Sequence, residues 1–174
     1  KQIELLLQSR KQKARVLTAE TATSGVWGFS TGKYRNRKVG GYFSLNANYH
    51  LIEAAQQEPE KCGIGRIMEA GMSFGWTFCP VPKYPYVWLF FGPGYTGAGQ
   101  YLPKPLEVDD EEDDDDKYKF CWYNSFSPEI GALIKVGPIA LRYTFQYRLA
   151  FDDSSKDLFE NNKTRHMFGV GICF

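Results

Sequence analysis

The sequence predicts an all-β protein, an eight-stranded antiparallel up-and-down transmembrane β-barrel. Three observations carry this prediction. Apolar residues alternate with small or polar ones along most of the chain, which is the period of a β-strand and excludes a helix. The alternating segments number eight, and the connections between them are short and long in turn. The two faces of these segments also differ in size, because one carries bulky apolar side chains and the other carries small or polar ones.

The predicted strands are bounded by turn residues and by polar stretches of sequence. They cover residues 14–22, 26–34, 39–51, 66–79, 84–97, 117–136, 139–151 and 164–174. The strand at 139–151 is the most regular, since every second residue from Ile139 to Phe151 is large and apolar. A tight turn at Gly137 and Pro138 precedes it, and a polar loop is expected at 152–163. The strand at 84–97 is apolar on both faces, so its orientation stays open.

Side-chain size separates a membrane barrel from a soluble one. A soluble barrel would bury the apolar face, yet eight strands enclose an interior only just wide enough for side chains to fill. Aromatic residues make up 16% of the chain, and such a lumen cannot hold so many rings. We therefore expect the rings to point outward into lipid. The mean hydropathy of −0.40 agrees with apolar residues interleaved among polar ones. A lipocalin-like barrel or a soluble sandwich is the alternative.

The most specific pattern is at the end of the sequence. Apolar residues occupy the last place and the third, fifth and seventh places from it, which are Phe174, Ile172, Val170 and Phe168. A strand of this kind resembles the C-terminal strand of bacterial outer-membrane β-barrels, where it is the signal read by the barrel-assembly machinery. The resemblance extends over residues 14–174, to small eight-stranded barrels of Gram-negative outer membranes in general. It implies outer-membrane lipids and the assembly machinery as partners.

The resemblance also implies a topology. A periplasmic C-terminus places the short turns near 35–38, 79–84 and 137–138 in the periplasm, and the loops near 22–25, 52–65, 98–117 and 152–163 outside. Short periplasmic turns and longer external loops are the asymmetry expected of outer-membrane barrels. Residues 1–13 are expected to form a short periplasmic helix, a tail or a linker to an upstream domain. The chain starts at Lys1 without an initiator Met, so we interpret it as a processed or excised segment.

Charge is strongly segregated along the chain. The formal net charge is +1, but the run from Asp109 to Asp116 holds eight of the 20 acids, so the remainder carries 21 bases and 12 acids, or +9. Many of the bases lie early in the sequence, at Arg10, Lys11, Lys13, Arg15, Lys33, Arg35, Arg37 and Lys38. On the periplasmic side they would meet anionic lipid head groups, or else remain solvated without a partner. The extracellular acidic loop argues against a nucleic-acid partner.

Ionisable residues on the small face point into the predicted lumen. They are Glu69, Glu129, Lys135, Arg142, Arg148 and His50. Charges in a narrow lumen must be paired or hydrated, because an isolated buried charge is costly. We expect a salt-bridged plug in which Glu129 pairs with Arg142 or Arg148 across neighbouring strands. Such a plug implies little conductance; the alternative is a selective pore or a proton path.

The acidic run is also a candidate calcium site, since carboxylate oxygens are preferred calcium ligands. Its candidate ligands are Asp109, Asp110, Asp113 and Asp114. Consecutive acids lack the spaced ligands and the glycine of an organised calcium loop, and charge runs are usually solvated. The sequence therefore predicts no bound metal and no cofactor.

Four cysteines are even in number, in a setting where disulfides persist. Cys62 and Cys121 both lie toward the outside and are the candidate disulfide pair. Cys79 and Cys173 lie near the periplasmic ends of the fourth and eighth strands, on opposite sides of the barrel, and no bond is expected between them.

The sequence offers little for catalysis. His50 and His166 are the two histidines of the chain, and His50 beside Ser44 lacks a third member for a triad. The sequence thus favours a non-enzymatic, integral outer-membrane barrel. It would act as an anchor, a scaffold or an accessory subunit of a larger outer-membrane complex with protein partners. The alternatives are a small porin-like channel and an enzyme active at the external rim.

Overall fold

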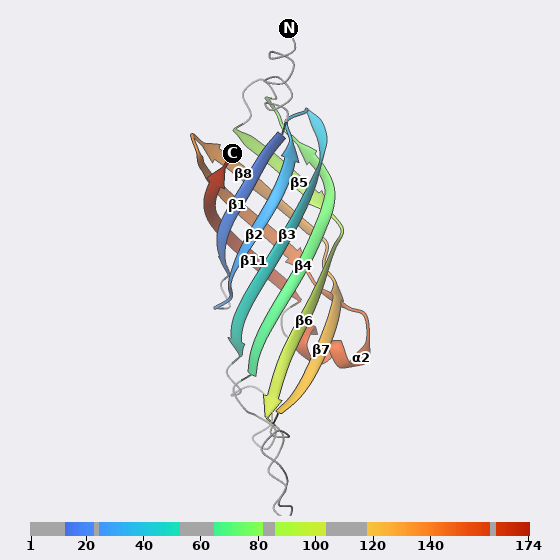
Figure 1. Ribbon diagram of the computed structural model, residues 1–174. Coiled ribbons are helices and arrows are strands. Elements are labelled where there is room, and N and C mark those ends of the chain that lie inside the picture. Colours follow the sequence, from blue (N-terminus) through green and yellow to red (C-terminus); the bar gives the residue numbers. More distant parts are fainter. Residues whose placement is uncertain (1–12, 23–24, 53–64, 82–85, 104–117, 161–162) are drawn as a thin grey trace, which may run out of the picture.

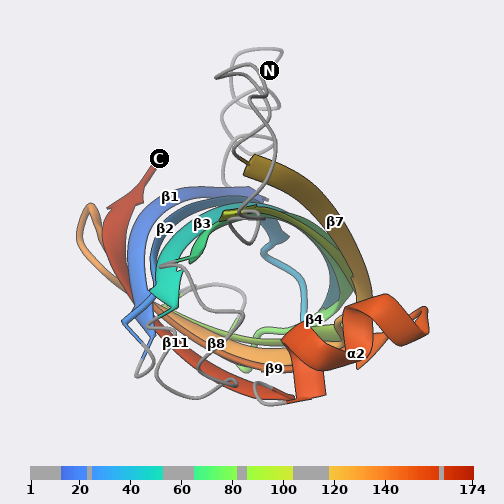
Figure 2. The ribbon, with the colours of Figure 1, turned by 90° about the horizontal axis from the view of Figure 1, so that it is seen from below.

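The computed structural model describes residues 13–22, 25–52, 65–81, 86–103, 118–160 and 163–174. They form a closed antiparallel barrel, seen along its axis in Figure 2. Its elements are β1 (Lys13–Ala22), β2 (Trp27–Arg35), β3 (Val39–Ile52), β4 (Gly65–Phe78), β5 (Val87–Gly92), β6 (Gly94–Pro103), β7 (Tyr118–Phe126), β8 (Glu129–Val136), β9 (Ile139–Tyr147), β10 (Leu149–Ala150), α2 (Asp153–Glu160) and β11 (Thr164–Cys173).

The eleven labelled strand segments form eight strands of the barrel wall, as the sequence predicts. We call each wall strand a stave, and three staves consist of two segments each: β5 with β6, β7 with β8, and β9 with β10. Pro93 separates β5 from β6, Pro128 lies between β7 and β8, and Arg148 lies between β9 and β10. Proline has no N–H to donate to the ladder, which explains two of the breaks. The register with the neighbouring stave continues across each break. The predicted long strand at 117–136 is therefore one stave with a gap.

Each stave is antiparallel to the next in the chain, and β1 closes the barrel by pairing with β11. The first described residue, Lys13, and Phe174 lie at the same end, which we name the terminal end (Figure 1). The hairpins β3–β4 and β6–β7 reach toward the opposite end, named the loop end. The predicted tight turn is present at the terminal end, where Gly137 has a φ of +62°.

The predicted alternation of faces is confirmed. On β3, Phe43 and Leu45 are exposed while Ser44 and Asn46 are buried. The structure also settles the stave that is apolar on both faces. Its residues Val87, Leu89 and Phe91 point outward, and Trp88 and Phe90 point into the lumen. This stave ends at Pro103 rather than at residue 97.

The terminal end of the lumen is filled by apolar side chains, which corrects the expectation of a purely polar plug. Its members are Ala14, Val16, Tyr34, Tyr42, Cys79, Trp88, Phe90, Leu133, Ala140 and Cys173. The rings of Tyr34 and Tyr42 stack at 5.8 Å between centroids, and both contact Phe90. The sequence predicts that such aromatic rings point outward because the lumen is narrow. They fit because several neighbours at this level, such as Ala14 and Ala140, are small. We call this cluster the aromatic layer.

The predicted polar loop at 152–163 contains the helix α2. Its N-terminus is capped by Asp152, whose Oδ1 accepts a hydrogen bond from the backbone N–H of Ser155 at 2.7 Å. The helix buries Leu158 and Phe159 against the inward residues Ile67 and Ala98 near the loop end. No helix among the described residues is long and apolar enough to cross a membrane.

Close strand packing gives a test of the barrel seam. At Gly171 on β11, an added Cβ would lie 1.8 Å from the carbonyl oxygen of Leu17 on β1. We expect Gly171→Ala to lower the free energy of unfolding by about 1–3 kcal/mol, because β1 and β11 must move apart. Equilibrium urea unfolding of the refolded barrel in detergent measures this.

The matched control is Gly41→Ala, where the nearest atom, the carbonyl oxygen of Gly75, would lie at an ordinary 3.5 Å. Equal stability of the two variants would show that the seam is looser than the structure indicates.

Candidate functional site

Buried charges occupy the lumen between the aromatic layer and the loop end. They are Glu20, Glu69, Glu129, Arg142, Arg148 and Arg165. Each of these side chains is 3% exposed or less. Carboxylates and guanidiniums are equal in number in this set, so its formal charge is zero. Every one of them forms an ion pair, as the cost of burying a charge requires.

The first group consists of Glu20, Arg142 and Glu129, and we name it the Arg142 network. Arg142, on β9, donates from Nη1 to Glu20 Oε1 on β1 at 2.7 Å, and from Nη2 to Glu129 Oε1 on β8 at 3.4 Å. The same Nη1 also donates to Ser30 Oγ on β2 at 2.7 Å. The guanidinium carbon lies 5.2 Å from the ring centroid of Phe90. One cation therefore joins two carboxylates and rests on the aromatic layer.

Neutral side chains also donate hydrogen bonds to the carboxylate of Glu129. Tyr42 donates its hydroxyl to Oε1 at 3.1 Å, Ser73 donates to the same oxygen at 2.6 Å, and Gln146 donates its amide N–H to Oε2 at 3.1 Å. Glu20 likewise accepts hydrogen bonds from Thr18 and Ser30. These donors come from β1, β2, β3, β4 and β9, so the network crosses the lumen and ties opposite walls together.

The second group consists of Glu69, Arg148 and Arg165, and we name it the Glu69 network. Arg148 donates from both Nη atoms to Glu69 Oε1 at 3.0 Å. Arg165, on β11, donates from Nη2 to the same oxygen at 3.0 Å and from Nη1 to Oε2. The ring of Phe159 from α2 covers Arg148, with 4.4 Å between the guanidinium carbon and the ring centroid. Here one carboxylate is shared by two cations, the inverse of the Arg142 network.

The predicted lumen residues divide between these networks. Glu129 meets Arg142, whereas Arg148 pairs with Glu69 instead. Lys135 is half-buried at the terminal end and forms no ion pair with any residue that the structure describes. The side chain of His50 lies outside the described residues.

Sequence reasoning missed two members, Glu20 and Arg165. Glu20 lies on the strand predicted at 14–22, for which no inward residues are named from the sequence, although period-two spacing from Thr18 places it inward. On the last strand only the outward residues from Phe168 to Phe174 are named from the sequence, and the opposite face includes Met167 and, two residues before it, Arg165. The signal for both residues was therefore present in the spacing.

The other predicted sites are only partly described. Phe168, Val170, Ile172 and Phe174 all point outward and are more than half exposed. Their recognition by assembly machinery stays a prediction. Cys62 and the acidic run lie outside the described residues, so the disulfide to the half-buried Cys121 and the calcium site also stay predictions. Within the described ranges, no three His, Cys, Asp or Glu side chains are grouped to hold a metal ion.

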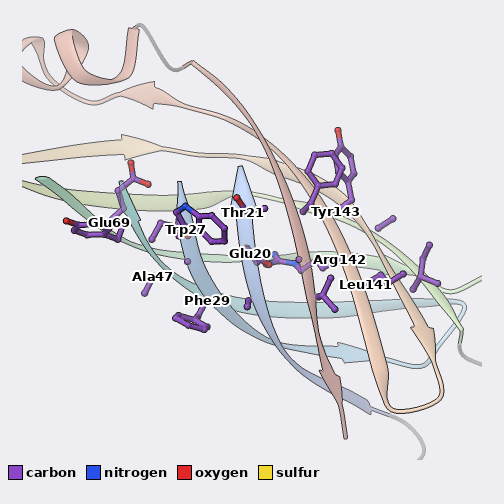
Figure 3. Close-up of a pocket in the computed structure, with 18 of the residues that line it drawn as sticks. Glu20, Thr21, Trp27, Phe29, Ala47, Glu69, Leu141, Arg142 and Tyr143 are labelled. Atoms are coloured by element: carbon purple, nitrogen blue, oxygen red, sulfur yellow. The ribbon is translucent and has the colours of Figure 1, made fainter. Parts of the chain in front are cut away.

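At the level of Glu20 and Arg142, an apolar pocket of about 790 Å³ is lined by residues from both faces of the barrel wall. Its lining runs across β8, β9, β11, β1, β2, β3 and β4 and is dominated by outward side chains. Figure 3 shows Glu20 and Arg142 between the strands, while Phe29 and Tyr143 point away from them. The polar groups thus lie inside and the apolar groups outside at the same level.

Solved structures share this architecture. Ail, the attachment invasion locus protein of Yersinia pestis, solved in complex with the heparin analogue sucrose octasulfate, matches with a TM-score of 0.58 and 13% identity over 93% of this chain and 98% of Ail. The N-terminal β-barrel domain of Pseudomonas aeruginosa OprF matches with a TM-score of 0.51 and 10% identity, over 94% and 98% of the two chains. Ail in a phospholipid bilayer nanodisc gives a TM-score of 0.50 and 15% identity, over 93% and 98%.

These likenesses show that the chain has the eight-stranded barrel fold of outer-membrane proteins. The sequence matches no protein-family model and no curated protein.

The Glu69 network gives a direct test of the buried charges. Glu69→Gln leaves Arg148 and Arg165 buried against a neutral amide. We expect a loss of about 3–5 kcal/mol in the free energy of unfolding, as when one partner of a buried ion pair is removed. Urea unfolding of the barrel refolded in lipid vesicles measures it.

Asp153→Asn is the matched control, because it makes the same chemical change in an ion pair with Lys156 that is exposed to solvent. An exposed pair contributes at most about 1 kcal/mol. A Glu69→Gln variant as stable as this control would contradict the importance of the Glu69 network.

Proposed function

We propose that this protein is an integral outer-membrane β-barrel with a closed lumen. In this proposal it acts as a membrane anchor or scaffold, or as an accessory subunit of a larger outer-membrane complex. The observation that carries the proposal is the inverted distribution of side chains. Charged groups are buried inside the barrel, and large apolar groups cover its outside. This is the arrangement of a protein whose surroundings are lipid.

The outward apolar wall includes residues from every stave. Its most exposed large members, all above 60%, are Trp27, Phe29, Val39, Met68, Phe151 and Phe174. Monomeric soluble proteins rarely expose a continuous apolar patch larger than a few hundred Å². Trp and Tyr on this wall are suited to the boundary between acyl chains and head groups. The fold shared with Ail and OprF supports a location in the bacterial outer membrane.

The filled lumen supports a role other than conduction. The aromatic layer, the Arg142 network and the Glu69 network follow one another along the axis, and α2 places Phe159 over the last of them. A solute would have to displace paired charges and packed rings in series. The wall and the ends of the barrel are then the surfaces left for partners. No described group of side chains suggests catalysis.

The lengths of the connections support the proposed orientation in the membrane. Short connections join β2 to β3 and β8 to β9 at the terminal end. The chain between β3 and β4 and between β6 and β7 is longer and belongs to the loop end. Outer-membrane barrels have short periplasmic turns, so we place the terminal end in the periplasm and the acidic run outside.

Lipid contact is tested by a charge placed on the wall at two depths. Leu45 and Val39 both point outward from β3, six residues and so about 20 Å apart along the strand. We expect Leu45→Lys to cost about 2–4 kcal/mol in vesicles and Val39→Lys about 0–1 kcal/mol, because the cost rises toward the bilayer midplane. Chemical denaturation in vesicles gives both values. Equal and small costs would place the wall in water.

Closure of the lumen is tested by recordings in planar lipid bilayers. We expect no stable open state from the unmodified barrel. Arg142→Ala is also expected to remain closed, because the aromatic layer and the Glu69 network still block the axis. A stable conductance that changes in Arg142→Ala would contradict the closed lumen and favour a channel.

A further inference from the structure

We infer that the outer face of the β1–β2 hairpin, at its terminal end, binds the phosphate head group of an anionic glycerophospholipid. This inference rests on the proposed function, since it requires the barrel to lie in a membrane. The site consists of Lys13, Arg15, Lys33 and Arg35, with Arg37 and Lys38 in the turn that follows. We name these six residues the basic patch.

The strand register brings the basic patch together. Lys13 lies directly opposite Arg35, and Arg15 lies directly opposite Lys33. All four side chains are exposed and share the outward face of the barrel. Like charges directly opposite each other on neighbouring strands are destabilising. An anion bound between two such successive pairs would offset this repulsion.

No carboxylate side chain among the described residues supplies that anion. None of the six side chains forms an ion pair or a hydrogen bond with a described residue. Glu20, Glu69 and Glu129 are buried in the lumen and already paired. Asp152 caps α2 and Asp153 is its first residue, so both lie toward the loop end. Within the described ranges, the positive charge of the basic patch therefore faces no acidic side chain.

The spacing suits a phosphate. Side chains directly opposite each other are about 5 Å apart at Cβ, and alternate residues along a strand are about 7 Å apart. The four cations of the two pairs thus surround an area of about the size of one phosphodiester. Arg15 and Arg35 lie on one diagonal, where their planar guanidiniums can each donate two hydrogen bonds to phosphate oxygens.

The surroundings favour a lipid over a soluble anion. Arg15 exchanges both backbone hydrogen bonds with Phe174 on one side, at 3.1 and 2.9 Å, and Lys33 is opposite Phe43 on the other. Both rings point outward. Farther along β1 the outward face continues with the apolar residues Leu17 and Ala19. A ligand with a phosphate on the basic patch and acyl chains along this wall fits both parts. An acidic peptide or a nucleic acid would leave the apolar part unused.

The test compares lipid preference in two variants of equal charge. Arg15→Gln/Lys33→Gln removes one cross-strand pair, and Lys156→Gln/Lys163→Gln removes two exposed cations of the α2 region. The full chain is reconstituted in vesicles of phosphatidylglycerol and phosphatidylcholine, and native mass spectrometry counts the lipids retained. Insertion is checked first, in vesicles of phosphatidylcholine alone, by protease protection. Failure to insert would overturn the proposed function and this inference together.

For an inserted barrel, we expect the unmodified protein and the α2-region variant to retain phosphatidylglycerol preferentially. Arg15→Gln/Lys33→Gln should lower that preference about 30-fold, from the contribution of each basic residue near an anionic surface. Its thermal stability in neutral detergent should be unchanged or higher, because a repulsive pair is gone. Insertion without a preference for phosphatidylglycerol, or an equal preference in both variants, would overturn this inference and leave the proposed function standing.

Discussion

The pairing of buried charges in a narrow lumen is the constraint on which the rest of the structure depends. Three carboxylates and three guanidiniums are enclosed where water has little access, so each needs a partner. The partners come from strands far apart in the chain. Arg142 joins β1 to β8, and Glu69 joins β4 to β11. The buried charges can therefore find their partners only when the barrel closes with the correct strand register.

Filling the lumen in this way determines what the protein presents to its surroundings. Polar and charged groups are used inside, and the outward positions are left to apolar side chains that only lipid or a protein partner can cover. The aromatic layer closes the terminal end, while Phe159 of α2 covers Arg148 near the loop end. A barrel closed by both apolar and ionic contacts is suited to holding a position in a membrane. The basic patch would fix its depth at one leaflet.

Much of the fold follows from a period of two, which is why the eight staves and the faces of most of them are predicted from sequence. The turn at Gly137 is predicted from its turn residues. The two-residue alternation does not show which inward charges form ion pairs, because the partners lie on different strands and the closed barrel sets the stagger between those strands. Arg148 illustrates this, since the sequence offers both Arg142 and Arg148 as partners of Glu129, and Arg148 contacts Glu69 instead. The helix α2 was missed because its apolar residues, Leu158 and Phe159, are too few to show a helical period. Inward aromatic residues such as Trp88 fit only because small side chains share their level.

The most direct test of the central claim compares two tryptophans on opposite sides of the wall. Trp76 is 57% exposed on the outside, whereas Trp88 is fully buried inside. Two single-tryptophan proteins, each with the other tryptophans replaced by Phe, would be reconstituted in vesicles containing brominated phospholipid. The inverted barrel predicts strong quenching of Trp76 by the lipid and little quenching of Trp88. Quenching of Trp76 by aqueous iodide, with no effect of brominated lipid, would contradict a wall that faces the membrane.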